Sequence, residues 1–164
     1  MPDLIRILKC LADEGVDFVV VGGFAAMLHG NDRVTRDVDL CVTLSRSNLG
    51  RFANAINPLV PRLRIKGPRI ALDDRPLGGA FSSIFTEAGQ IDVINELSGT
   101  DSVSGIFERA VIFKLGTFEV KVAHIDDLIA MKEAAGRPHD LQDAANLRWL
   151  RDETARRAAQ SPGE

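Results

Sequence analysis

The chain has 164 residues, 45% of them apolar and 26% charged, which is typical of one soluble globular domain with its own core. Lys and Arg number 20 and Asp and Glu number 23, so the net charge of −3 excludes a chain-wide basic attraction to nucleic acid or membranes. The apolar runs are too short to span a bilayer, and the first residues lack a signal-peptide pattern. Cys10 and Cys41 fit neither a disulfide framework nor a zinc-ligand spacing. We therefore expect a cytoplasmic protein with no membrane partner.

The first part of the chain alternates helices and strands. Apolar residues three and four apart indicate the helices, while β-branched runs and apolar–polar alternation indicate the strands. In chain order we expect a helix between Asp3 and Gly15, a strand at 18–21, a helix at 24–29, a strand at 37–42 and a helix at 45–56.

The second part of the chain is predicted to form two hairpins and a helical end. The hairpin strands are 81–86 with 90–94, and 111–115 with 117–122, and the helices are 126–135 and 138–150. This order predicts an α/β (α+β) domain, with a small mixed β-sheet flanked by helices. We assign 1–150 to that domain and 151–164 to a polar, flexible tail.

The chemistry-bearing stretch lies between residues 20 and 40. Gly22 and Gly23 end the first strand, and glycines at a strand-to-helix bend let backbone N–H groups approach a phosphate closely. Asp37 and Asp39 are two residues apart on a strand, so both carboxylates emerge on one face. Because like charges this close repel, a divalent cation such as Mg²⁺ is a natural partner, and it usually shares its oxygen ligands with substrate phosphates.

This pattern, an apolar residue and Gly-Gly, then thirteen residues, then Asp-apolar-Asp-apolar, resembles the signature of the DNA polymerase beta-type nucleotidyltransferase superfamily. Within it, the chain is similar to the minimal members and to the AbiEii-type nucleotidyltransferases linked to toxin–antitoxin systems. Two further segments agree with the resemblance. One is Arg33-Val34-Thr35-Arg36, and the other is Leu128-Ile129-Ala130-Met131-Lys132, followed by Gly136-Arg137 and then by Asp140 and Asp143.

The resemblance implies a Mg²⁺-dependent transfer of a nucleoside monophosphate from ATP or another nucleoside triphosphate to a hydroxyl, with pyrophosphate leaving. It implies a third carboxylate on a later strand, Asp92, which would join Asp37 and Asp39 as a catalytic residue and metal ligand. The implied nucleotide-binding residues are Gly22, Gly23, Arg33, Thr35, Lys132 and Asp143. Arg33 or Lys132 would neutralise the β- and γ-phosphates. Lys132 is the favoured one, with Asp143 or Asp140 orienting it.

The acceptor stays open among RNA, protein and a small molecule, and so does the partner, a cognate toxin or antitoxin or a second copy of the chain. One alternative is a nucleotide- or partner-binding module of a toxin–antitoxin pair with little turnover, and another is a structural protein that binds a divalent ion. At the level of single residues, the glycines could form a plain turn, Asp37 and Asp39 an exposed strand face, Asp92 a solvated edge position and Lys132 a surface position.

The stretch 57–80 matches no pattern that we can name. Within it Arg62, Arg64 and Lys66 alternate with apolar residues, which favours a charged edge strand over a polyanion-binding strand face. The three histidines have no metal-ligand spacing, and Trp149 is expected to pack the last helix onto the domain.

Overall fold

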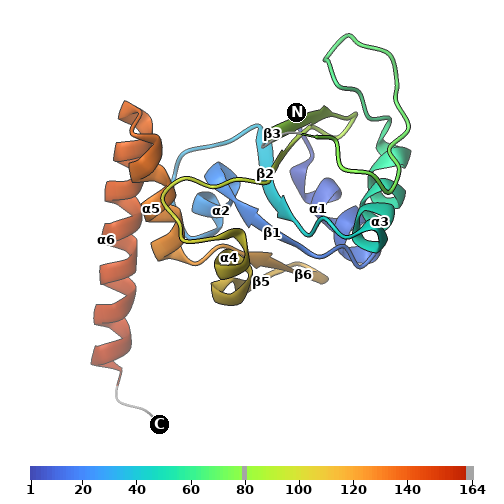
Figure 1. The fold of residues 1–164 in the computed structure, drawn as a ribbon. Coiled ribbons are helices and arrows are strands. Elements are labelled where there is room, and N and C mark those ends of the chain that lie inside the picture. The colour runs from blue at the N-terminus through green and yellow to red at the C-terminus, as the bar shows by residue number, and fades with distance from the viewer. Residues whose placement is uncertain (79–80, 162–164) are drawn as a thin grey trace.

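A mixed β-sheet forms the centre of the computed structural model, which describes residues 1–78 and 81–161 (Figure 1). Its strands are β1 (Phe18–Val21), β2 (Asp37–Val42), β3 (Phe81–Phe85), β4 (Gln90–Ile94), β5 (Val111–Leu115) and β6 (Phe118–Val122). They lie in the order β3-β4-β2-β1-β6-β5. The central strand β1 is antiparallel to β2 and parallel to β6, and β2 is parallel to β4.

Helices surround this sheet. They are α1 (Leu4–Asp13), α2 (Gly22–Leu28), α3 (Arg46–Ile56), α4 (Val103–Arg109), α5 (Ile125–Ala135) and α6 (Pro138–Gln160), with a short 3-10 helix at Asn57–Leu59. α1 packs with α3 on one side of the molecule, and α5 packs with α6 on the other (Figure 1). None of the described helices is both long and apolar enough to cross a bilayer.

The core lies between the sheet and its helices. All four residues of β1 are buried, which matches their unbroken β-branched and aromatic character. α1 buries Leu4, Ile7, Leu8 and Leu11 on one face of the helix. Leu4, Leu8 and Leu11 belong to the apolar stripe expected from the sequence, whereas Ile5, also expected in it, is exposed and Ile7 takes the buried position. The mixed sheet flanked by helices confirms the predicted fold class, and both predicted hairpins are present.

Two local predictions were wrong, and one helix was missed. The basic stretch from Arg62 to Lys66 is no strand: Arg62 alone forms a bridge, to Phe85, and a turn follows in which the Gly67 N–H donates to the carbonyl of Arg64. Trp149 does not pack the last helix onto the domain, because this residue is 60% exposed. α4 was not predicted, since its seven residues contain a glycine and only three large apolar side chains.

The last helix also differs from its prediction. α6 ends at Gln160 rather than at Leu150, so residues 151–160 are helical. Arg151, the first residue of the predicted tail, pairs with Asp126 of α5 at 2.9 Å. The three final residues, 162–164, lie outside the described part of the chain, and the flexibility of the tail stays a prediction.

Candidate active site

The bend after β1 brings the backbone against a carboxylate of β2. Gly22 has a positive φ of 65°, and a Cβ built on it would lie 2.1 Å from Oδ2 of Asp39. A Cβ on Gly23 would lie 3.3 Å from the side chain of Thr35. Glycine at position 22 is therefore required both by its backbone conformation and by the close approach of Asp39. A plain turn would need only the first of these.

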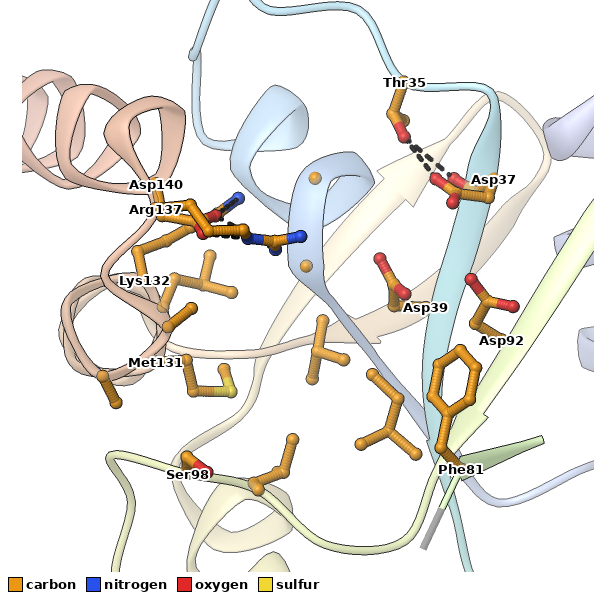
Figure 2. A pocket seen from close by; sticks show the side chains of 18 of the residues that line it. Thr35, Asp37, Asp39, Phe81, Asp92, Ser98, Met131, Lys132, Arg137 and Asp140 are labelled. Carbon is orange, nitrogen blue, oxygen red and sulfur yellow. Dashed lines mark hydrogen bonds and ion pairs between the residues drawn. The ribbon is translucent and has the colours of Figure 1, made fainter. Parts of the chain in front are cut away.

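The three predicted carboxylates lie on two adjacent strands of the sheet. In the parallel pairing of β2 with β4, Asp39 is directly opposite Asp92. Asp37 is two residues before Asp39 and therefore emerges on the same face of β2. All three line one pocket together with Gly22 and Gly23 (Figure 2).

Burial and the neighbouring charges both change the pKa of the middle carboxylate, Asp39. Burial, followed by the charges of Asp37 and Asp92, raises the pKa of Asp39 to about 7, although the Gly23 N–H and the charge of Lys132 act in the opposite direction. Without a cation, the carboxyl of Asp39 therefore changes its charge close to neutral pH. A bound cation would counteract the shift, because its positive charge favours the ionised carboxylate.

The outer two carboxylates are held by hydrogen bonds. The Thr35 hydroxyl donates to Oδ1 of Asp37 at 2.6 Å. Asp92 is 5% exposed, and its Oδ1 accepts from Ser83 Oγ at 2.7 Å and from Gln90 Nε2 at 3.0 Å. Because β4 lies between β3 and β2, Asp92 is not the solvated edge residue considered as an alternative.

The donor chemistry of this pocket suits a hard cation in part. Mg²⁺ in phosphoryl-transfer sites is commonly held by one or two carboxylates plus substrate phosphates, and Asp37 and Asp39 supply such a pair. Within residues 1–78 and 81–161, however, no three His, Cys, Asp or Glu side chains are grouped closely enough to hold a metal ion. The pair fits Mg²⁺, and the third ligand, Asp92, stays a prediction.

A second charged group forms the opposite wall of the pocket. Lys132 Nζ lies 2.9 Å from Oδ2 of Asp143 and 3.2 Å from Oδ1 of Asp140, and both carboxylates are buried. Arg33 pairs with Oδ2 of Asp143 at 3.1 Å, and Arg137 with Oδ2 of Asp140 at 2.6 Å. The late Lys-to-Asp segment therefore folds back to the Gly-Gly bend. Asp143 itself does not line the pocket and contacts it through Lys132 and Arg33.

Burial alone would raise the pKa values of Asp140 and Asp143, yet both are lowered. For Asp140 the hydrogen bonds from Arg137 and Lys132 outweigh burial, and for Asp143 those from Lys132 and Asn31 do so. Both groups therefore stay ionised at neutral pH and keep Lys132 in place.

The pocket has a cavity volume of about 520 Å³, within the usual range for small-molecule sites. Sequence reasoning gave no role to several of its lining residues, among them Phe81, Leu97, Ser98, Met131, Arg137 and His139. It also missed Ser83, which the observed register of the β3–β4 hairpin places opposite Asp92.

Magnesium affinity is expected to depend on pH through Asp39. Since its pKa is about 7, protons compete with the cation below that pH. Calorimetric titration with Mg²⁺ should show affinity that rises roughly tenfold per pH unit up to about pH 7 and then levels off. An Asp39→Asn variant should show weak binding with no such rise, and a flat profile in the unmodified protein would contradict the assignment.

Removing Lys132 is expected to destabilise the fold. A Lys132→Met variant leaves Asp140 with Arg137 and Asp143 with Arg33 and Asn31, so we expect a loss of about 2–3 kcal/mol in unfolding free energy, somewhat below the usual cost of breaking a buried pair. Urea unfolding would measure it. The control is Lys9→Met, whose exposed partner is Asp13, with an expected change of less than about 0.5 kcal/mol. Equal effects of the two variants would contradict this account.

The fold is that of a nucleotidyltransferase. A crystal structure from Thermotoga maritima, provisionally assigned as a nucleotidyltransferase, superposes with a TM-score of 0.53 and covers 93% of this chain and 96% of that one. At 14% sequence identity, this likeness shows the fold alone.

A family model adds a match in sequence. Residues 1–49 match the family described as "Nucleotidyl transferase of unknown function (DUF2204)". The matched part includes the Gly-Gly bend and both aspartates of β2 but ends before Asp92 and Lys132. No curated protein matches the chain. Together the two matches support the nucleotidyltransferase superfamily, and neither names the AbiEii-type subgroup.

Proposed function

We propose that the protein is a Mg²⁺-dependent nucleotidyltransferase that moves a nucleoside monophosphate from a nucleoside triphosphate such as ATP to a hydroxyl acceptor. The observation that carries the proposal is the grouping of Asp37, Asp39 and Asp92 around the Gly22 bend in one pocket. The fold and the family match of the first 49 residues support the same class.

The chain's own residues then have distinct roles. Asp37 and Asp39 would hold the cation, which when bound offsets charge on the triphosphate and on the leaving pyrophosphate. Asp92, fixed by Ser83 and Gln90, would orient the attacking hydroxyl and accept its proton. Gly22 and Gly23 keep side chains away from the phosphates. Thr35 holds Asp37 in its orientation.

Positive charge for the β- and γ-phosphates would come from the opposite wall. Lys132 lines the pocket but is already paired with two buried carboxylates, while Arg33 and Arg137 are more exposed. We therefore propose that Lys132 supplies a fixed charge and that Arg33 and Arg137 reach the phosphates directly. The proposal leaves the acceptor open among RNA, protein and a small molecule. It includes a role in a toxin–antitoxin pair.

The second candidate is a nucleotide-binding module with little turnover. The observation that favours it is that the described residues contain no group of three side chains placed to hold a metal. In that case acceptor recognition or a missing ligand would come from a cognate partner or a second copy of the chain.

Label transfer distinguishes the two candidates. The protein would be incubated with each α-labelled nucleoside triphosphate and Mg²⁺, in the presence of total RNA, of proteins including itself, or of small hydroxylated molecules. The enzyme is expected to attach label to one class of acceptor and to release an equal amount of pyrophosphate, both of which chelation of the metal abolishes. Nucleotide binding without pyrophosphate release in any of these mixtures would instead support the binding module.

A further inference from the structure

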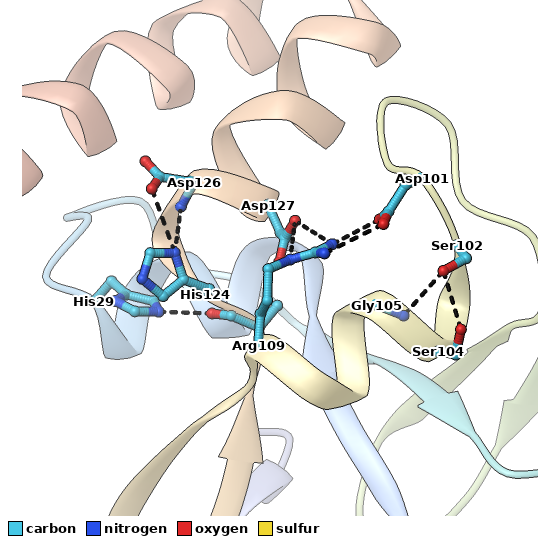
Figure 3. Close-up of polar contacts among 10 residues, drawn as sticks. His29, Asp101, Ser102, Ser104, Gly105, Arg109, His124, Asp126 and Asp127 are labelled. Atoms are coloured by element: carbon cyan, nitrogen blue, oxygen red, sulfur yellow. Dashed lines mark hydrogen bonds and ion pairs between the residues drawn. The ribbon is translucent and has the colours of Figure 1, made fainter.

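The guanidinium of Arg109 connects the 95–102 segment to α5. Arg109 lies in the last turn of α4 and reaches Asp127 in the first turn of α5, with Nε 2.9 Å from Oδ2 and Nη2 2.9 Å from Oδ1. The same guanidinium reaches Asp101, with Nη2 2.7 Å from Oδ1 and Nη1 3.3 Å from Oδ2 (Figure 3). Two forked pairs from one side chain use the planar donor set that only arginine offers.

The segment that carries Asp101 is built to approach α5 closely. Gly99 has a φ of 83°, and a Cβ on it would lie 2.3 Å from the carbonyl oxygen of Ala130. A Cβ on Gly105 would lie 2.7 Å from Oδ1 of Asp101 and 2.9 Å from Nη1 of Arg109. Both glycines therefore make room, one for the contact with α5 and one for the ion pair itself.

The two elements that Arg109 connects, the 95–102 segment and α5, both line the candidate active site. The segment 95–102 contributes Leu97 and Ser98, and α5 contributes Leu128, Met131 and Lys132. In Figure 2, Ser98 and Met131 lie on the side of the pocket away from Thr35 and Asp37. This side is the more apolar one and suits a nucleobase, whereas the carboxylate side suits a metal-bound triphosphate.

The two pairs differ in their surroundings. The Asp127 side chain is 11% exposed and the Asp101 side chain is 65% exposed. The hydrogen bonds from Arg109 lower the pKa of Asp101, so that pair persists at neutral pH. The buried pair with Asp127 anchors Arg109 to α5, and the exposed pair with Asp101 holds the 95–102 segment. A substitution at Asp101 can break the exposed pair and leave the buried charge of Asp127 paired.

We infer that Arg109 is a positioning residue that fixes the 95–102 segment against α5 and thereby shapes the base-binding end of the pocket. The inference rests on the proposed function for the identity of the ligand. The mechanical part, that Arg109 and Asp101 hold this segment, is independent of it.

The test compares Asp101→Asn and Arg109→Lys with Arg157→Lys, a control at an exposed arginine that pairs with Glu153 on α6. Hydrogen exchange of the nucleotide-free proteins is measured for peptides that cover 95–102. Roughly tenfold faster exchange is expected in the two test variants and not in the control, because the loop loses its anchor while the fold remains. Arg109→Lys also perturbs a buried pair, so Asp101→Asn is the decisive variant should the other fail to fold.

The second part of the test measures ligand binding. The dissociation constants of the four nucleoside triphosphates with Mg²⁺ should rise roughly tenfold in Asp101→Asn, because the competent loop conformation is less populated. The constant for inorganic triphosphate should stay the same, since it has no base. Unchanged exchange at 95–102, or equal losses for inorganic triphosphate and nucleotides, would overturn the inference. If the unmodified protein binds no nucleotide, the proposed function fails, and the exchange arm still decides whether Arg109 holds the loop.

Discussion

Replacing Asp39 by Asn should abolish nucleotide transfer while leaving the protein folded. Asp39 lies between Asp37 and Asp92 and against the Gly22 bend, so it is the carboxylate most central to cation binding. A metal in such a site supplies several kcal/mol of transition-state stabilisation, so label transfer should fall by roughly a thousandfold or more. Asp13→Asn is the matched control, because Asp13 is an exposed carboxylate paired with Lys9 on α1.

The same substitution should stabilise the metal-free protein at high pH. The pKa of Asp39 is raised from its ordinary value of 3.8 to about 7 in the folded state, so the folded state holds the proton more tightly than the unfolded state does. Stability therefore falls as pH rises from 3.8 to about 7 and is constant above that. An asparagine carries no charge, and its amide oxygen can still accept from the Gly23 N–H.

Urea unfolding without Mg²⁺ at about pH 8 should thus show Asp39→Asn to be more stable than the unmodified protein, by a few kcal/mol at most. The difference should vanish at about pH 3, where Asp39 is protonated in both states. Retained transfer, or a loss of stability at high pH, would contradict the role given to Asp39. A gain in stability paired with a loss of activity is the usual sign of a functional group kept at a structural cost.

Replacing Gly22 by Ala should remove activity at a small cost in stability. The added Cβ would lie 2.1 Å from Oδ2 of Asp39, and the carboxylate is the part that can move away. The backbone at φ 65° also becomes strained, which costs about 1–2 kcal/mol for a non-glycine residue. Displacement of Asp39 should reduce both Mg²⁺ affinity and label transfer by more than about a hundredfold, as loss of a positioned catalytic group does.

Gly116 offers a matched control for this experiment. It lies at the turn between β5 and β6 with the same φ of 65°, and a Cβ there would meet nothing within 4 Å. Gly116→Ala should therefore lose the same 1–2 kcal/mol and keep full activity. If both variants retain transfer equally, the close approach of Gly22 to Asp39 has no catalytic role.

The centre of the site could be predicted because its parts are local in sequence. Gly22 and Gly23 follow a fully buried strand, and alternation in β2 puts Asp37 and Asp39 on one face. The hairpin signal at 87–89 predicts that β3 pairs with β4, although only the observed register shows that Ser83 is opposite Asp92. That β2 and β4 are neighbours is not local information. The resemblance implied only that a third carboxylate, Asp92, lies on a later strand.

Other features depend on contacts that no single segment encodes. Trp149 is two positions after Leu147, one of the four residues that α6 buries, so its side chain is turned roughly 200° away from Leu147 around the helix axis. The alternation from Arg62 to Lys66 resembles a strand, but a turn closed between Arg64 and Gly67 follows the single bridge. The pairing of Arg109 with Asp101 and Asp127 joins residues from three segments, and their spacing in sequence carries no signal.

The most direct test of the central claim is a crystal structure with Mg²⁺ and a non-hydrolysable nucleoside triphosphate. The account predicts a cation bound by Asp37 and Asp39 together with phosphate oxygens, the phosphates over Gly22 and Gly23, and the base between α5 and the 95–102 segment. A triphosphate bound elsewhere, or bound in this pocket with no cation on Asp37 or Asp39, would contradict it.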